Sequence, residues 1–206
     1  MDPHSFDSRA ATWDDEGKVQ RASAVARTIL ETVPLDPSMR LLEYGAGTGL
    51  VTQALRDAVG PVTLADTSTG MREVIARKIE AGELTNARIW DVDLTTQPVP
   101  DDRVDVIVTV MTLHHIENVS AVLAAFAELL VDGGRLCVVD LEEEDGSFHG
   151  EGFDGHRGFQ RSRLAEDLVG AGFSDVEFRN CHEIERSDGR YPLFLATCCR
   201  GASLVI

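Results

Sequence analysis

The chain has 206 residues, 43% hydrophobic and 26% charged, which are ordinary proportions for a soluble globular protein of one domain. Its formal net charge of −16 argues against a general nucleic-acid-binding protein, because such proteins neutralise phosphates with clustered Lys and Arg. Four cysteines without CxxC spacing, no apolar run near ~18 residues and an N-terminus without signal-peptide features favour a reduced, cytoplasmic protein that does not span a membrane.

Hydrophobic patterning predicts helices and strands that alternate along the first two thirds of the chain. Apolar residues at helical spacing predict a helix from Lys18 to Val33, which Pro34 ends. Strands are expected at 41–44, 62–66, 87–90, 104–110 and 136–140, with helices at 50–58, 71–79 and 120–131. Ser68 is expected to cap the second of these helices, and the Asp-Gly-Gly sequence at 132–134 to close the third.

The remaining third begins with a polar, glycine-rich stretch from Leu141 to Gly158. It is too long for a simple connection, so we expect it to be functional. A helix at about 162–169 and two strands near 176–185 and 191–199 follow, and the strands could pair as a hairpin. The whole pattern predicts an α/β fold with a doubly wound, mostly parallel, seven-stranded Rossmann-like sheet and an antiparallel C-terminal edge.

A glycine-rich turn follows the first predicted strand. Gly45, Gly47 and Gly49 alternate with single residues between a strand that carries Glu43 and a helix that begins near Leu50. Glycine is needed where the backbone takes positive φ or lies against a ligand, and the following helix start offers free N–H groups. A dinucleotide fingerprint, G-x-G-x-x-G, would need its third glycine one residue later, which makes a dehydrogenase the weaker alternative.

Acidic residues recur where the predicted strands end. They are Glu43, Asp66, Asp91 or Asp93, and Asp140. Ligands of open α/β sheets bind beyond these ends, so the acids are expected to surround a ligand. Asp66 lies 17 residues after Gly49, a suitable distance for an acid that hydrogen-bonds ribose hydroxyls.

In order and spacing, these segments resemble the motifs of class I S-adenosylmethionine-dependent methyltransferases of the small-molecule type, over about residues 39–140. The segments that carry the resemblance are Leu41–Leu50, Leu64–Ser68 with Met71, Asp93, Val104–Ile107, Leu113–Ile116 and Leu129–Leu136, with Ala171–Phe173 beyond them. The resemblance implies one methyltransferase domain over residues 1–206. Within it, residues 1–37 would form an N-terminal helical lid, 38–140 the cofactor-binding half and 141–206 the substrate-side half.

The resemblance also implies S-adenosylmethionine as cofactor and a role for each matching residue. The glycine turn would wrap the methionine moiety with Gly45, Ala46, Gly47 and Gly49. Glu43 would help to orient this moiety, and Tyr44 departs from the small or acidic residues common at its position. Asp66 would hold the ribose hydroxyls.

The adenine and methyl ends of the cofactor would meet later segments. Thr67 and Met71 would flank the adenine. The segment Asp91-Val92-Asp93-Leu94 would meet its edge, with Asp93 accepting from the amino group, the Leu94 N–H meeting the ring and Asp91 competing with Asp93. Val110 and Met111 would line the methyl-donor side. Phe6–Asp14 resembles the N-terminal lid of such enzymes, and a frayed helix anchored by one Trp is the alternative.

Methyl transfer from a sulfonium needs alignment and exclusion of water, and a general base only if the nucleophile carries a proton. Four histidines are candidates for that base or for substrate contacts: His149 and His156 in the long loop, and His114 and His115 after the fourth strand. For the latter pair, packing or hydrogen bonding is the alternative. A metal site of His149, His156 and acids lacks a recognised ligand spacing, so a metal-independent enzyme is expected. Residues 191–194 are expected to line the pocket or to pack in the core.

The leading hypothesis is a methyltransferase acting on a small organic acceptor, as a monomer or homodimer. A protein or tRNA methyltransferase is a second enzyme class, although the acidity of the chain argues against RNA. A non-catalytic module that only binds S-adenosylmethionine is the third hypothesis.

Overall fold

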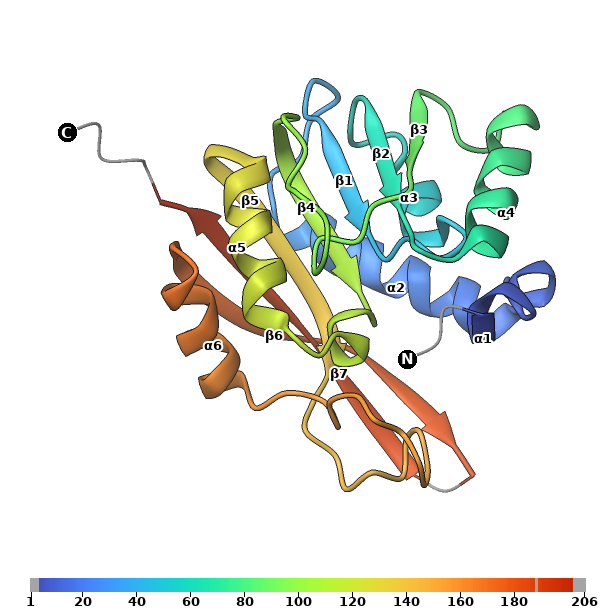
Figure 1. Ribbon diagram of the computed structural model, residues 1–206, viewed down its shortest axis with the longest axis vertical. Helices are drawn as coiled ribbons and strands as arrows, with labels where there is room; N and C mark the ends of the chain where they lie inside the picture. The colour runs from blue at the N-terminus through green and yellow to red at the C-terminus, as the bar shows by residue number, and fades with distance from the viewer. Residues whose placement is uncertain (1–3, 188, 202–206) are drawn as a thin grey trace. The chain divides into compact units, whose positions relative to one another are not determined.

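A computed structural model describes residues 4–187 and 189–201, with the side chains of residues 4 and 5 left aside. The described chain forms two compact units, one up to Asp93 and the other from Leu94 onward (Figure 1). The division between the two units falls near the middle of the chain. The single methyltransferase domain expected from the sequence stays a prediction.

The first unit is built around three parallel strands in the order β3-β2-β1. Its elements are α1 (His4–Asp7), η1 (Ala10–Thr12), α2 (Glu16–Thr32), β1 (Leu41–Tyr44), α3 (Leu50–Leu55), β2 (Val62–Ala65), α4 (Thr69–Glu80) and β3 (Ala87–Trp90). β1 and β2 are buried along their whole length, as expected of parallel strands with covered faces. Ser68 caps α4 as predicted, since its side chain accepts a hydrogen bond from the Met71 N–H at 3.2 Å.

The second unit contains four strands in the order β4-β5-β7-β6. Its elements are β4 (Val104–Val110), η2 (Leu113–His115), α5 (Val119–Leu129), β5 (Leu130–Leu141), α6 (Arg161–Gly170), β6 (Phe173–Arg186) and β7 (Gly189–Arg200). β4 and β5 are parallel, whereas β7 runs antiparallel to both β5 and β6. With seven mainly parallel strands and an antiparallel C-terminal hairpin, the predicted fold class is confirmed.

Two predicted boundaries differ from the structure. α5 ends at Leu129 rather than at Val131, because Leu130 is already extended, with φ −74° and ψ 142°. The Asp-Gly-Gly sequence at 132–134 thus does not close the helix but lies inside β5, where the register against β4 shifts. α3 ends at Leu55, three residues earlier than expected. Such terminal differences are usual for helices read from periodicity.

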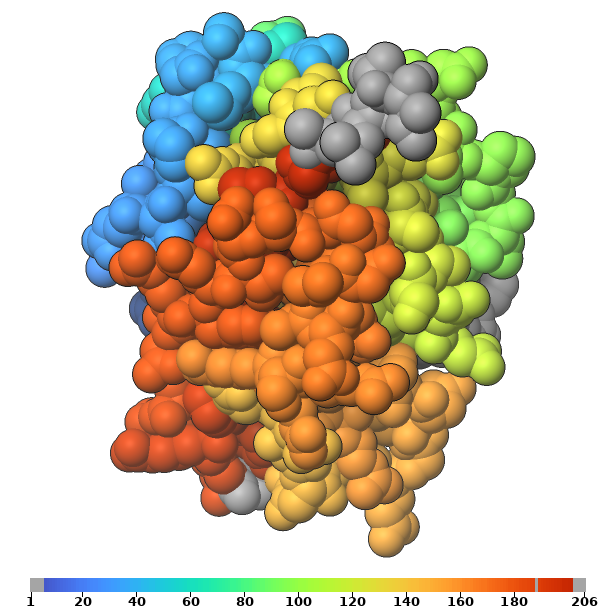
Figure 2. Space-filling view, turned by 90° about the vertical axis from the view of Figure 1, so that its left-hand side faces the viewer, coloured from blue at the N-terminus to red at the C-terminus, as the bar shows by residue number. Residues whose placement is uncertain are grey.

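Strand β6 forms a largely exposed edge of the second unit. Among the described residues it pairs only with β7, and the register shifts twice, between Ser174 and Glu177 and between Asn180 and His182. Figure 2 shows the face of the molecule on which β6 and α6, in orange, lie. Within the part of the chain that the structure describes, no helix has the length and apolar character needed to cross a bilayer.

Candidate functional site

The glycine turn between β1 and α3 has the backbone geometry that the sequence predicts. Gly45, Gly47 and Gly49 have φ of 70°, 55° and 79°, the left-handed region that side chains other than glycine disfavour. The N–H groups of Gly45 and Ala46 donate to the Ala65 carbonyl at 2.8 and 3.0 Å, which fixes the turn to the end of β2. The part of this turn in wrapping a methionine moiety stays a prediction.

Two of these glycines are required for different reasons. A Cβ on Gly49 would lie 2.8 Å from Leu64 Cδ2 and 3.1 Å from Leu84 Cδ1, so Gly49 lets α3 start against the core. A Cβ on Gly47 would lie 3.6 Å from Trp13 Nε1, an ordinary contact distance. Gly47 therefore faces the N-terminal segment rather than the core, and a Cβ there would not clash with the described residues.

Glu43 is turned toward α3. Its side chain is only 3% exposed, and its Oε2 accepts hydrogen bonds from the Thr52 N–H at 3.0 Å and the Thr52 hydroxyl at 2.5 Å. Burial raises the pKa of Glu43 to about 7, against the opposing effect of the two Thr52 hydrogen bonds. Glu43 thus stabilises the first turn of α3, and its predicted contact with the cofactor stays untested.

The raised pKa of Glu43 gives the folded chain a pH-dependent stability. The folded carboxyl keeps its proton up to about pH 7, whereas the usual value of 4.5 applies once the chain unfolds. Between these pH values the folded state binds more protons, so stability falls as pH rises, by on the order of 3 kcal/mol in all. Glu43→Gln stays neutral at every pH and can still accept hydrogen bonds from Thr52. Its stability relative to the wild type should therefore be greater at pH 8 than at pH 5. Urea unfolding at both pH values measures this difference.

The control is Glu73→Gln, which neutralises an exposed acid on α4 in the same unit. Its stability relative to the wild type should be nearly the same at pH 5 and pH 8. If Glu43→Gln behaves like this control, the buried carboxyl does not carry the pH dependence.

Asp66 lies at the end of β2 with its carboxylate against the glycine turn. Oδ2 accepts from the Gly47 N–H at 2.7 Å and Oδ1 from the Ser68 N–H at 2.9 Å. Burial raises the pKa of Asp66 despite these two hydrogen bonds. An ionised carboxylate has about four acceptor positions, so this one can still take hydrogen bonds from a diol.

The predicted adenine contacts differ in their surroundings. Met71 is buried at the start of α4, while Thr67 is exposed. The Asp91 carboxylate is 69% exposed and pairs with Arg72 at 2.9 Å. Which of Asp91 and Asp93 accepts from the adenine amino group stays a prediction. Tyr44, Ala46, Val92 and Leu94, which the sequence also predicts to contact the cofactor, are buried.

The N-terminal segment is tied to the first unit by two acids that the sequence did not single out. Asp7 accepts from the Ser68 hydroxyl at 2.5 Å and from the Gly70 N–H at 3.0 Å, at the start of α4. Asp14 pairs with the buried Lys78 at 2.7 Å and also accepts from the Thr48 hydroxyl of the glycine turn. Together with the position of Trp13 near Gly47, these contacts attach the N-terminal segment at several points, and its role as a lid stays a prediction.

At the carboxyl end of β4 in the second unit, Val110 and Met111 are half-buried. Met111 has a φ of 55°, and its N–H donates to the Val139 carbonyl at 2.8 Å. A non-glycine residue in this region costs about 1–2 kcal/mol, so the chain holds Met111 there with this hydrogen bond. The predicted position of both residues beside the methyl donor stays untested.

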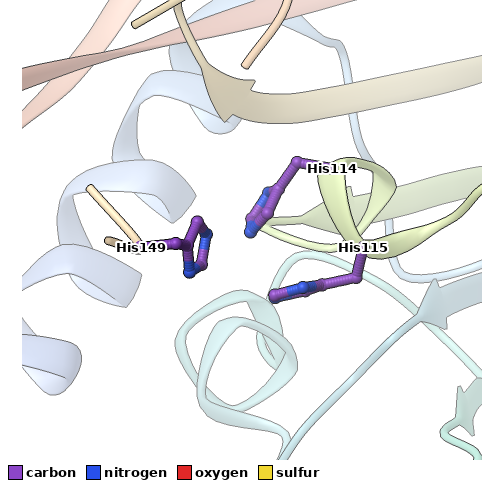
Figure 3. Close-up of side chains that lie close together, drawn as sticks. All are labelled: His114, His115 and His149. Carbon is purple, nitrogen blue, oxygen red and sulfur yellow. The ribbon is translucent and has the colours of Figure 1, made fainter. Parts of the chain in front are cut away.

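Three histidines meet beyond the carboxyl ends of β4 and β5 (Figure 3). His114 and His115 come from η2, and His149 comes from the loop after β5. The ring centroid of His114 lies 4.0 Å from that of His115 and 5.0 Å from that of His149, and the centroids of His115 and His149 are 5.3 Å apart. His114 Nδ1 is 2.6 Å from Asp140 Oδ1, with both side chains only 1% exposed. We call His114, His115 and His149 the histidine cluster.

His149 and His156, which the sequence placed together in one loop, have different surroundings. His149 stacks on Phe153 with ring centroids 3.9 Å apart, and burial, His114 and Arg186 lower its pKa to about 4. His156 Nε2 is 2.9 Å from the Ile116 carbonyl. The His156 backbone N–H donates to the His114 carbonyl, so this residue attaches the loop to η2.

The other predicted pocket segment, residues 191–194, lies largely in the core. Phe194 is fully buried, and Tyr191 is also buried, with its hydroxyl 2.8 Å from Ser147 Oγ. Core packing, the second of the two expectations for this segment, is what these side chains do.

Comparison with known protein sequences identifies the family. The model of a methyltransferase domain matches residues 18–182. The chain is 30% identical over 166 residues to an uncharacterized methyltransferase of Geobacillus thermodenitrificans, with 80% of this chain and 74% of that protein covered. It is 29% identical over 121 residues to the ubiquinone/menaquinone biosynthesis C-methyltransferase UbiE of Shewanella pealeana. That match covers 57% of this chain and 48% of UbiE, so the chain spans about half the length of such relatives.

Among solved structures, the fold is similar to that of a SAM dependent methyltransferase from Aquifex aeolicus, with a TM-score of 0.71 and 20% identity. The similarity covers 97% of this chain and 99% of that one. The chain therefore belongs to the methyltransferase domain family, and with it to the class I S-adenosylmethionine-dependent methyltransferases that its motifs resemble.

Proposed function

We propose that this protein transfers the methyl group of S-adenosylmethionine to a small organic acceptor. The observation that carries the proposal is the arrangement at the ends of β1 and β2, where a turn with three positive-φ glycines donates the Gly47 N–H to the Asp66 carboxylate. A nucleoside whose ribose hydroxyls donate to Asp66 would extend along the backbone of the turn. In this proposal Gly47 leaves room for the cofactor, and the segment that ends at Asp14 covers it.

The reaction that fits this arrangement is an in-line displacement. The acceptor's electron pair forms a bond to the methyl carbon while the carbon–sulfur bond breaks and sulfur keeps its electrons as S-adenosylhomocysteine. Because the reactive group arrives on the cofactor, the protein has to align the two molecules and exclude water. The bonds of Asp7 to Ser68 and of Asp14 to Lys78 would hold the N-terminal segment closed for that purpose.

Acceptor size and chemistry are supported less directly. The name of the UbiE relative describes methylation at carbon in quinone biosynthesis, which favours a small organic acceptor for this chain. The net charge of −16 disfavours tRNA, while a protein acceptor or a module that only binds the cofactor remains as an alternative. Of the four candidate histidines, we assign the acceptor contacts to His114, His115 and His149, because His156 already bonds to Ile116. A cytoplasmic monomer or homodimer stays a prediction.

The test begins with cofactor binding. Asp66→Ala is expected to weaken S-adenosylhomocysteine binding by roughly tenfold to a hundredfold, since a hydrogen bond to a charged group contributes about 1.5–3 kcal/mol. Calorimetry on the wild type and variant measures the change. The protein is then incubated with S-adenosylmethionine and a panel of phenols, amines and carbon nucleophiles. Formation of S-adenosylhomocysteine distinguishes catalysis from binding alone.

Asp66→Asn is the matched control, because it keeps the size of the side chain and one oxygen that can accept from Gly47. It should retain the thermal stability of the wild type more closely than Asp66→Ala, yet bind the cofactor less tightly than the wild type. Tighter binding of NADH than of S-adenosylhomocysteine to the wild type would refute the methyltransferase proposal in favour of a dehydrogenase.

A further inference from the structure

We propose that His114, His115 and His149 form a binding site for one divalent transition-metal ion of the Zn²⁺ type. This departs from the metal-independent enzyme expected from the sequence. The difference arises because the sequence pairs His149 with His156, whereas the fold brings His149 to the two histidines of η2 (Figure 3).

The three side chains are close enough to share an ion. One ring nitrogen from each lies within 4.8 Å of the other two. In a tetrahedral Zn²⁺ site with Zn–N bonds of about 2.0–2.1 Å, neighbouring nitrogens are roughly 3.3 Å apart. Closing that difference takes a shift of about 1–1.5 Å, and His149 can make it because it lies on a loop while His114 and His115 are fixed on η2.

Asp140 sets the orientation of His114. Its carboxylate forms a hydrogen bond with the ring Nδ1 of His114 at 2.6 Å and accepts another from the His114 backbone N–H at 3.3 Å. Since a carboxylate only accepts, the proton of a neutral His114 ring is on Nδ1, and Nε2 presents its lone pair. A carboxylate that holds the far nitrogen of a ligating histidine is a usual feature of zinc sites.

Two of the nitrogens in the cluster lack the partners that buried polar atoms normally have. His114 Nε2 and His149 Nε2 are buried, and neither has a hydrogen-bond partner among the residues that the structure describes. Leaving a buried acceptor unpaired costs about 1–3 kcal/mol, and a bound ion would remove that cost at both atoms.

The charge around the cluster is compatible with a cation. The carboxylates of Asp140 and Glu144 act on His149 against the ring of His114 and the guanidinium of Arg186.

The donor set indicates the class of ion. Three neutral imidazoles suit Zn²⁺, Co²⁺ or Ni²⁺ rather than Mg²⁺ or Ca²⁺, which prefer oxygen ligands. Three protein ligands also leave a coordination position open, as in catalytic rather than structural zinc sites. Water or an oxygen or nitrogen atom of a small ligand would take that position.

The experiment is metal binding by the full-length protein after treatment with a chelator. Calorimetry with Zn²⁺, and visible absorption with Co²⁺, should detect one ion per chain. His149→Phe, which keeps the stack on Phe153, should weaken binding at least a hundredfold. Asp140→Asn should weaken it by about tenfold to a hundredfold with the stoichiometry unchanged, as for other residues that orient metal ligands.

His156→Gln is the control, because it changes a histidine of the same loop and can still donate to Ile116. It should bind Zn²⁺ as the wild type does. Nitrogen-15 spectra of the wild-type imidazoles provide a second measurement that needs no variant, and Zn²⁺ should shift signals of His114, His115 and His149 only. Absence of Zn²⁺ and Co²⁺ binding, full affinity in His149→Phe, or shifts confined to other histidines would refute the site. None of these measurements involves methyl transfer, so their failure would leave the proposed function standing.

Discussion

Gly47→Val is expected to weaken S-adenosylmethionine binding at least a hundredfold while the chain remains folded. Among the described residues, a Cβ at this position would have only Trp13 Nε1 within 4 Å, at 3.6 Å, so a branched side chain would fill the space between the turn and Trp13. Positive φ at residue 47 adds backbone strain of about 1–2 kcal/mol, which most domains survive with 5–15 kcal/mol of stability. Calorimetric titration and thermal unfolding of the same sample measure the two effects.

Gly47→Ala also places a Cβ at positive φ, but with a smaller side chain that lacks branching at Cβ. We expect it to bind the cofactor more tightly than Gly47→Val and to unfold at the same or a higher temperature. Wild-type affinity in a folded Gly47→Val variant would contradict the assignment of this turn to the cofactor.

Gly49→Ala should instead destabilise the fold, by about 2–5 kcal/mol. The new Cβ would lie 2.8 Å from Leu64 Cδ2 and 3.1 Å from Leu84 Cδ1, and overpacking of this kind costs about 1–3 kcal/mol. The left-handed backbone at φ 79° adds about 1–2 kcal/mol. For a chain of this size the melting temperature should fall by roughly 4–20 °C.

Gly82→Ala is the matched control for this variant. Gly82 has a similar φ of 76°, and nothing described by the structure lies within 4 Å of its Cβ position. Its substitution therefore measures the backbone strain alone. Equal stability of the Gly49 and Gly82 variants would show that the Leu64 contact does not limit residue 49.

Most of the fold could be predicted because local sequence determines it. The β-branched run at 104–110 and the apolar strands that precede it specify buried parallel strands, and these are found where expected. The end of α5 could not be predicted in the same way. Leu130 continues the helical periodicity, yet it pairs with Val104 as the first residue of β5. A pairing with a distant strand decides that boundary, and periodicity does not report it.

The candidate site was predictable where spacing carries the information. The glycine turn and Asp66 follow from short motifs, while contacts between distant residues do not. Lys78 appears in the sequence as part of the apolar face of a helix, and its pairing with Asp14 becomes visible only in the fold. A lysine on the apolar face of a helix is the one feature of the sequence that could have indicated a buried ion pair. The pairing of His114 with Asp140, 26 residues apart, is of the same kind.

The exposed edge formed by β6 affects the tendency of this chain to aggregate at high concentration. An unpaired strand edge is a template for adding another strand, and natural proteins block it with charges and irregular register. β6 has both protections, with two register shifts and charged side chains at Asp175, Glu177, Arg179, Glu183, Glu185 and Arg186. Strand-to-strand aggregation through this edge is thereby disfavoured, and a homodimer, if the protein forms one, would have to bury a different surface.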